Sequence, residues 1–153
     1  MAKLAFSNRQ RTKPLNPRRL REIAEAILAY LPRVKDWDLM FYFVGAARMA
    51  DINARHLGHP GATDVITFDY NDPEVPGRIC GEIFICVDVA IEQAREFRTS
   101  WQSEVVRYMV HSILHLCGYD DLKPAERREM KQAENRLVAK FSRQFKLSAV
   151  GRQ

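Results

Sequence analysis

The chain has 153 residues, of which 46% are hydrophobic and 28% are charged, and a formal net charge of +5. This length and composition are typical of one globular domain with its own core. No apolar run approaches the ~20 residues of a membrane span, and the basic N-terminus lacks the apolar region of a signal peptide. We therefore expect a single cytoplasmic domain over residues 1–153 that does not contact a membrane.

Basic residues concentrate at the two ends of the chain. Residues 1–21 contain seven Lys or Arg and no acidic residue, and residues 123–153 contain nine basic residues against three acidic ones. The central residues 22–122 then hold 8 basic and 16 acidic residues. This pattern is typical of ends that help to hold a polyanion and a middle that holds a cation, although solvated surface charge would give it equally well.

The first third of the chain predicts two strands and two helices. Residues 3–7 form a short strand, and Asn16 is the N-cap of a helix over 17–31 that begins with proline. The aromatic and almost continuously apolar residues 38–44 are typical of a central strand. A second helix is expected over about 46–57.

The middle of the chain predicts two more strands and a third helix. The Gly- and Pro-rich loop 58–62 leads into a β-branched strand over 63–70. Strand 80–86 follows after a second loop. Asp88 is the expected N-cap of a helix that continues to about Phe97.

The fourth helix is the most apolar one. It is expected to begin after 99–102, whose Thr and Gln are spaced as a capping box. Apolar residues cover most of its circumference, so the helix is buried. A single polar stripe interrupts them, formed by Arg107, His111 and His115, and such a stripe needs partners.

A last amphipathic helix is expected over about 124–141, followed by a flexible basic tail over 142–153. Helices interleaved with about four strands, without strict βαβ repetition, predict an α+β fold. The expected architecture is a four-stranded mixed sheet with about five flanking helices and a metal site on the buried helix and the turn after it.

His111 and His115 lie four residues apart on one helical face, which is a chelating arrangement. Gly118 supplies the positive φ that lets the chain turn back, so that Asp121 can offer a carboxylate to the same point. Asp120 is the competing carboxylate. Two imidazoles and one carboxylate suit one Zn²⁺ per chain without excluding Mn²⁺, Ni²⁺ or Fe²⁺, and three protein ligands leave a catalytic position open.

A metal bound in this way would activate water and polarise a carbonyl or phosphoryl oxygen. The spacing also matches the metzincin peptidase pattern His-Glu-x-x-His-x-x-Gly-x-x-His in three features. Where that pattern needs a glutamate as general base, this chain has Ser112, which cannot accept a proton near pH 7. A metzincin-like peptidase is therefore the less favoured alternative.

Three blocks of the sequence resemble the YbeY family of bacterial rRNA-maturation endoribonucleases. The blocks are 53–68, which contains TDVITF, 81–85 (GEIFI) and 111–119 (HSILHLCGY). Their order and spacing are specific, and the resemblance covers most of residues 40–135. It implies an α+β domain with a four-stranded mixed sheet.

The resemblance also implies a function. Family members are zinc-dependent endoribonucleases specific for single-stranded RNA, and they act on small-subunit rRNA in 16S 3′-end maturation and ribosome quality control. Ribosomal proteins and an assembly GTPase are the implied partners. Here water activated by a metal on His111, His115 and Asp121 would attack the RNA phosphodiester, which makes the two histidines catalytic through that water. A ribosome-assembly factor that binds RNA around a largely structural metal is the alternative.

Two positions depart from the usual family pattern. Asp121 stands where most members have a third histidine, and aspartate is a competent ligand there. Leu57 stands where many members have an arginine thought to contact substrate, so Arg55 is a candidate for that contact.

Two further residues, His59 and Glu82, are candidates for the site. His59 could meet a phosphate, or it could be an ordinary loop residue. Glu82 could face the cleft as a catalytic group. Asp64 is expected to cap a turn rather than act as a base.

Overall fold

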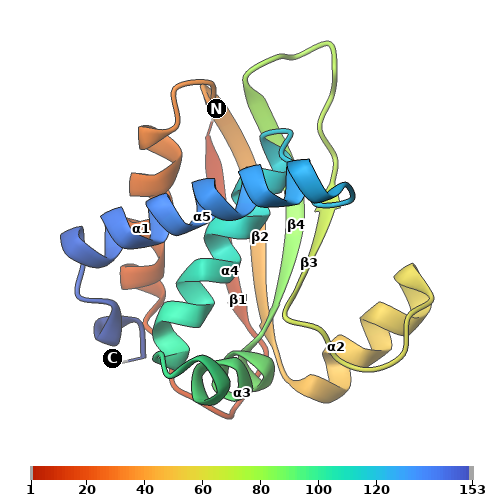
Figure 1. The fold of residues 1–153 in the computed structure, drawn as a ribbon, viewed down its shortest axis with the longest axis vertical. Helices are drawn as coiled ribbons and strands as arrows, with labels where there is room; N and C mark the ends of the chain where they lie inside the picture. The colour runs from red at the N-terminus through yellow and green to blue at the C-terminus, as the bar shows by residue number, and fades with distance from the viewer. Residues whose placement is uncertain (1, 152–153) are drawn as a thin grey trace.

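The computed structural model describes residues 2–151 and shows one four-stranded sheet in the order β1-β2-β4-β3 (Figure 1). The strands are β1 Lys3–Asn8, β2 Asp36–Val44, β3 Val65–Asp69 and β4 Arg78–Cys86. β1, β2 and β4 run parallel, and β3 pairs antiparallel with the edge of β4. The α+β fold with a four-stranded mixed sheet is therefore confirmed.

Five α-helices accompany the sheet within residues 2–151, as expected. They are α1 Pro17–Tyr30, α2 Ala46–Ile52, α3 Val87–Phe97, α4 Trp101–Leu116 and α5 Pro124–Gln144. A π-helical turn, η1 Asn53–Leu57, continues α2, and a 3-10 helix, η2 Leu147–Gly151, follows α5. The predicted start of α1 is correct, because the Asn16 side chain accepts a hydrogen bond from the Arg19 backbone N–H.

The main core lies between the inner face of the sheet and helices α1 and α4. Alternate strand residues such as Phe41 and Ile83 belong to one buried cluster with Val106 and Ile113 of α4, and all four are fully buried. Figure 1 shows α5 crossing over α4 on the side away from the sheet. Because α4 is covered by the sheet on one side and by α5 on the other, it needs apolar residues around most of its circumference.

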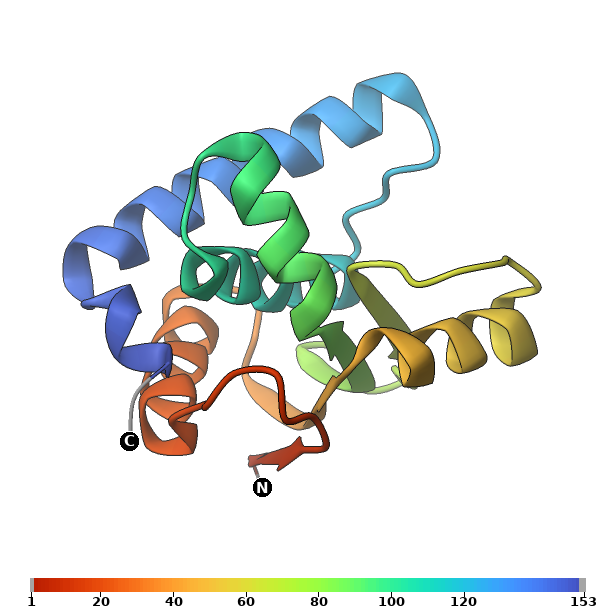
Figure 2. The same cartoon turned by 90° about the horizontal axis from the view of Figure 1, so that it is seen from below.

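A smaller apolar cluster lies on the outer face of the sheet. Met49 and Ile52 of α2 pack there against Ile66 of β3 and Val44 of β2. Figure 2 shows α2 and η1 on the opposite side of the sheet from α4 and α5. The two faces of the sheet therefore have different surroundings, and only the inner one faces α4.

Two predicted helix caps are wrong by one or two residues. Asp88 lies in the first turn of α3, and its carboxylate accepts hydrogen bonds from the Ala46 backbone N–H at 2.6 Å and from the Thr12 hydroxyl at 2.8 Å. Asp88 therefore caps α2 from a distance instead of its own helix. The N-cap of α4 is Ser100, because its hydroxyl accepts from the Ser103 backbone N–H.

The expected flexible tail over 142–153 is wrong for residues 142–151. α5 continues to Gln144, and η2 then folds back with Leu147 and Val150 buried in the main core. The Val150 carbonyl also accepts a hydrogen bond from the Asn16 backbone N–H. Burial of these two apolar side chains stabilises the return of the chain, which the many basic residues of the segment did not indicate. Residues 152–153 of the predicted tail lie outside the described residues.

Among residues 2–151, none of the helices combines the length and the apolar character needed to cross a bilayer.

Candidate metal and RNA site

Helix α4 positions the polar stripe that the sequence predicted. Its neighbouring residues pack against the sheet, whereas Arg107 and His111 are partly exposed on the side that faces α5. Ser112 points the other way. It is fully buried, and its hydroxyl donates to the Met109 carbonyl at 2.8 Å.

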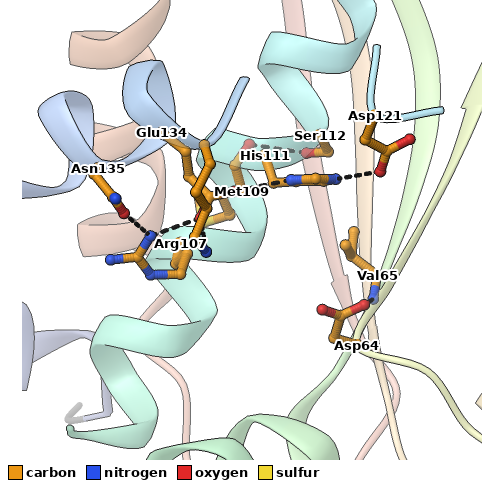
Figure 3. Close-up of polar contacts among 10 residues, drawn as sticks. Asp64, Val65, Arg107, Met109, His111, Ser112, Asp121, Glu134 and Asn135 are labelled. Carbon is orange, nitrogen blue, oxygen red and sulfur yellow. Dashed lines mark hydrogen bonds and ion pairs between the residues drawn. The ribbon is translucent and has the colours of Figure 1, made fainter. Parts of the chain in front are cut away.

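The His111 ring is held between two carboxylates. Its Nδ1 lies 2.8 Å from Oε1 of Glu134 on α5, and its Nε2 lies 3.9 Å from Oδ2 of Asp121 (Figure 3). Asp121 comes from the segment after α4, which turns at Gly118 with a φ of 101°. The predicted turn is therefore confirmed, and it brings Asp121 back toward His111.

Glu134 is a buried carboxylate with three hydrogen-bond partners. Besides His111, it accepts from Arg107 Nη1 at 2.6 Å and from Lys131 Nζ at 3.0 Å. Burial alone would raise the pKa of Glu134, but these three partners lower it to about 2. For His111, burial has the opposite effect and by itself would lower the pKa. The hydrogen bond to Glu134 outweighs burial, so the pKa of His111 is raised.

This hydrogen bond determines the tautomer of His111. An ionised Glu134 can only accept, so Nδ1 must carry the proton, and in the neutral ring Nε2 then has the free lone pair. Metal-binding histidines are commonly oriented by a carboxylate in this way. Two ligands on one tetrahedral zinc ion are roughly 3.3 Å apart, so the 3.9 Å between Nε2 and Asp121 fits a shared ion after a small adjustment.

The structure brings together two of the three predicted ligands. His115 lies one turn beyond His111 on α4, but within residues 2–151 no three His, Cys, Asp or Glu side chains converge closely enough to hold a metal ion. Asp120 turns elsewhere, because its carboxylate accepts from the Leu122 backbone N–H at 3.0 Å and lines a different cavity. Asp121 is thus the carboxylate that faces His111.

His111 and Asp121 open into a cavity of about 650 Å³, which we call the α4 groove. The groove lies over α4, between α3 and α5, and has the size of a small-molecule site. Asp64, at the entry to β3, lines it opposite His111 (Figure 3). The residues that line the groove are Asp64, Gln93, Phe97, Thr99, Glu104, Arg107, Tyr108, His111, Asp121, Arg127, Met130, Lys131, Glu134 and Asn135.

The groove has cations from one of the two basic segments. Arg127 and Lys131 of α5 are exposed along it, and the partly exposed Arg107 of α4 lines it as well. The residues that line it include none from 1–21. Only the later basic segment therefore reaches this cavity in the part of the chain that the structure describes.

Glu82 does not belong to this group. It lies on β4 between the glycine and the isoleucine that face α4, so it points to the outer face of the sheet. There its carboxylate accepts from the hydroxyls of Tyr42 at 3.0 Å and Tyr70 at 2.8 Å. The structure thus separates Glu82 from His111 by the whole sheet and corrects its expected place in the cleft.

Arg55 and His59 also lie away from the groove. Arg55 is on η1 and pairs with Asp51 at 2.8 Å, and His59 follows in the exposed loop. Neither is among the residues that line the groove. Their contact with a substrate stays a prediction.

Glu134 is the residue that the sequence analysis missed. It lies on the buried side of α5, between Met130 and Leu137, where a carboxylate has to find partners. That position on an otherwise apolar stripe is a detectable signal. Asp64 fits its predicted place at a turn, because its Oδ1 accepts from the Val65 backbone N–H at 2.8 Å. The residue also lines the groove, which its sequence context does not indicate.

Comparison with known proteins gives one consistent family. The family model described as Endoribonuclease YbeY matches residues 5–142. A curated relative of the same description from Thermobifida fusca is 37% identical over 137 residues, which is 85% of this chain and 88% of the relative. Another, from Parabacteroides distasonis, is 37% identical over 105 residues, covering 69% of this chain and 72% of the relative.

A solved structure supports the fold alone. The solution structure of a Thermotoga maritima protein superposes with a TM-score of 0.57 at 23% identity, covering 89% of this chain and 87% of that one.

Proposed function

The chain belongs to the YbeY family of endoribonucleases, which are hydrolases and metalloenzymes, and from this premise we propose that it cleaves single-stranded RNA with one zinc ion held by His111, His115 and Asp121. The observation that best supports the proposal is the orientation of His111. Glu134 fixes its Nδ1, and its Nε2 faces Asp121 inside a groove lined by cations.

Each group of residues has a separate role in this proposal. A bound zinc ion would supply a Lewis acid and activate water near neutral pH. Glu134 holds the His111 ring in one tautomer and orientation. Arg127 and Lys131 attract the phosphates of the strand, and the Asp64 carboxylate lies across the groove from His111.

The experiment compares cleavage of one fluorescent single-stranded RNA by four zinc-loaded proteins. These are the wild type, His111→Ala, His115→Ala and His56→Ala, of which the last removes an exposed histidine outside the groove. We expect the first two variants to lose about 100-fold or more in rate and to bind zinc more weakly, while His56→Ala stays near the wild type. Folding and RNA affinity are matched beforehand.

If His115→Ala cuts RNA as fast as the wild type while its zinc affinity has fallen, the activity comes from a contaminant and the enzyme proposal fails. Absence of stoichiometric metal after metal-replete purification would remove the site itself. A protein that binds RNA and metal but never cuts would instead be an assembly factor with a structural metal.

The metzincin alternative loses its remaining support at Ser112. Its hydroxyl is fully buried and bonded to the Met109 carbonyl, so the position that holds the peptidase base does not face the groove. A peptide substrate would have no general base there.

We propose further that the natural substrate is small-subunit rRNA, including its 3′ end, in ribosome quality control, with ribosomal proteins and an assembly GTPase as partners. The three sequence blocks that resemble the family support this proposal. Cleavage of precursor 16S rRNA, compared between naked RNA and assembled subunits, tests it, because unrelated RNA cut at the same rate in both settings would contradict it.

A further inference from the structure

The α4 groove continues well beyond the residues proposed to hold the metal. It follows α4 from His111 back to Glu104, which is seven residues or about 10 Å along the helix axis. At about 3.4 Å per nucleotide of a stacked strand, this length corresponds to at most about three nucleotides. The far half of the groove therefore lies within reach of a base next to the bond that is cut.

Tyr108 lines this far half, and its buried hydroxyl has no hydrogen-bond partner. Within residues 2–151, Tyr108 Oη is the only buried side-chain nitrogen or oxygen that has no hydrogen bond, and Tyr108 is 4% exposed. A buried hydroxyl without a partner costs free energy, so such groups generally have a reason. A ligand atom that accepts a hydrogen bond would satisfy it.

Glu104 is one turn away on the same side of α4. It is 5% exposed, and its Oε2 accepts from the Thr99 hydroxyl at 3.1 Å. No Lys, Arg or His pairs with it in the described chain at ion-pair distance. Its carboxylate can therefore accept a further hydrogen bond from a ligand that enters the groove.

The wall of the groove adds a surface for a flat ring. Phe97, at the end of α3, is 59% exposed and lines the same cavity. Proteins that bind single-stranded RNA use exposed aromatic rings to stack on bases and nearby cations to contact phosphates. Arg127 and Lys131 supply those cations on the opposite wall.

From this juxtaposition we infer that the far half of the α4 groove is a nucleobase subsite that prefers adenine or cytosine to uracil. Both preferred bases have an exocyclic amino group beside an unprotonated ring nitrogen. The amino group donates to Glu104, and the ring nitrogen accepts from Tyr108. Uracil instead has N3–H between two carbonyl oxygens, so it would bring an oxygen against the carboxylate. The inference rests on the proposed function.

The test measures cleavage and binding with short oligomers of A, of C and of U, and with an A oligomer in which purine riboside, which lacks the amino group, replaces adenosine. The zinc-loaded protein is used, binding is followed by fluorescence anisotropy, and RNA integrity is checked by gel. We expect the A and C oligomers to bind and to be cut at least about fivefold better than the U and purine riboside oligomers.

Two variants assign the preference to this part of the groove. Tyr108→Phe removes only the hydroxyl and should reduce the preference for adenine and cytosine over uracil without loss of folding. Tyr30→Phe, at an exposed tyrosine elsewhere, should keep that preference unchanged. Glu104→Gln should shift the preference toward uracil, because the amide can donate to a carbonyl oxygen. If Glu104→Gln does not fold, Tyr108→Phe and the purine riboside oligomer decide.

Equal binding and cleavage of the A, C and U oligomers by the wild type would overturn the subsite, as would an unchanged preference in Tyr108→Phe. Neither result would affect the proposed endonuclease activity, which needs only metal-dependent cleavage. Conversely, a protein that never cuts RNA would still show or lack the base preference in the binding measurement, so the two failures are distinguishable.

Discussion

The orientation of His111 depends on Glu134, which contacts Nδ1 of the ring, whereas Asp121 faces Nε2. Arg107 and Lys131 hold the Glu134 carboxylate, and it in turn holds the ring. Because the network is anchored on α5, the histidine is pre-oriented before any ligand arrives. Groups that orient a metal ligand in this way affect metal affinity even though they do not bind the ion.

Glu134→Gln should therefore lower zinc affinity about 10- to 100-fold, because the neutral amide holds the Nδ1 proton less strongly and can also turn its NH₂ toward the ring. Isothermal titration calorimetry measures the change, and nitrogen NMR of His111 reports the tautomer. Glu129→Gln, on the exposed side of the same helix, is the control. Unchanged affinity in both variants would show that Glu134 is only structural.

Asp121 and Asp120 should differ in the same measurement. Asp121→Asn is expected to weaken zinc binding at least about tenfold, because the carboxylate that faces His111 loses its charge. Asp120→Asn should leave it near the wild type, since the Asp120 carboxylate bonds to the Leu122 backbone. The reverse order of effects would make Asp120 the ligand.

For single residues, the sequence predicted which side chains form the candidate site better than it predicted what each of them contacts. The four-residue spacing of the histidines and the glycine turn are local, so they could be read directly. The contact between His111 and Glu134 joins two helices, and the face of Glu82 depends on which side of the sheet is covered. Neither of these is encoded in local spacing.

Among the elements, α4 and β4 approach each other closely at one point. A Cβ at Gly81 would lie 2.6 Å from the Phe68 carbonyl oxygen and 3.2 Å from both methyl groups of Leu116. Gly81 therefore lets the end of α4, just beyond His115, rest directly on the sheet. The part of the helix that leads into the turn proposed to bind the metal is supported by strand backbone.

Gly81→Ala should destabilise the protein by about 1–3 kcal/mol, because one of the close contacts is with backbone that cannot move away freely. Urea unfolding followed by circular dichroism measures this. Ser148→Ala, at an exposed position, should leave the unfolding midpoint near that of the wild type. A Gly81→Ala protein of unchanged stability would contradict the close packing.

Glu82 offers a test on the other face of the sheet. Its hydrogen bonds raise the pKa of Tyr42 and of Tyr70, because the nearby carboxylate opposes the phenolate charge. Glu82→Gln should lower both pKa values toward the ordinary range, as followed by NMR of the tyrosine rings, and leave zinc affinity unchanged. A large loss of zinc affinity would return Glu82 to the site.

For the molecule as a whole, periodicity predicted every strand and α-helix to within a few residues. It did not predict the fold of residues 142–151, because this segment is too short for its few apolar residues to give a periodic signal. It also could not show which basic segment lies at the groove. That depends on α5 crossing over α4, which is a property of the tertiary fold.

Val150→Ala should lower the free energy of unfolding by about 1–3 kcal/mol, since the side chain is fully buried where η2 meets the main core. Chemical denaturation gives the value. Ala149→Gly, at the neighbouring and less buried position, separates loss of packing from loss of helical conformation. A Val150→Ala protein as stable as the wild type would mean that the end of the chain is loosely attached in solution.

The strand order has a kinetic consequence. β2 and β4 are neighbours in the sheet but are separated in sequence by residues 45–77, so a long loop must close before they pair. β3 lies inside that loop and pairs only with β4, so it can join the sheet only once β4 is available. Asp64 precedes β3 directly. The wall of the groove opposite His111 is therefore expected to form late, and a partly folded chain would have its histidine helix before it has a closed groove.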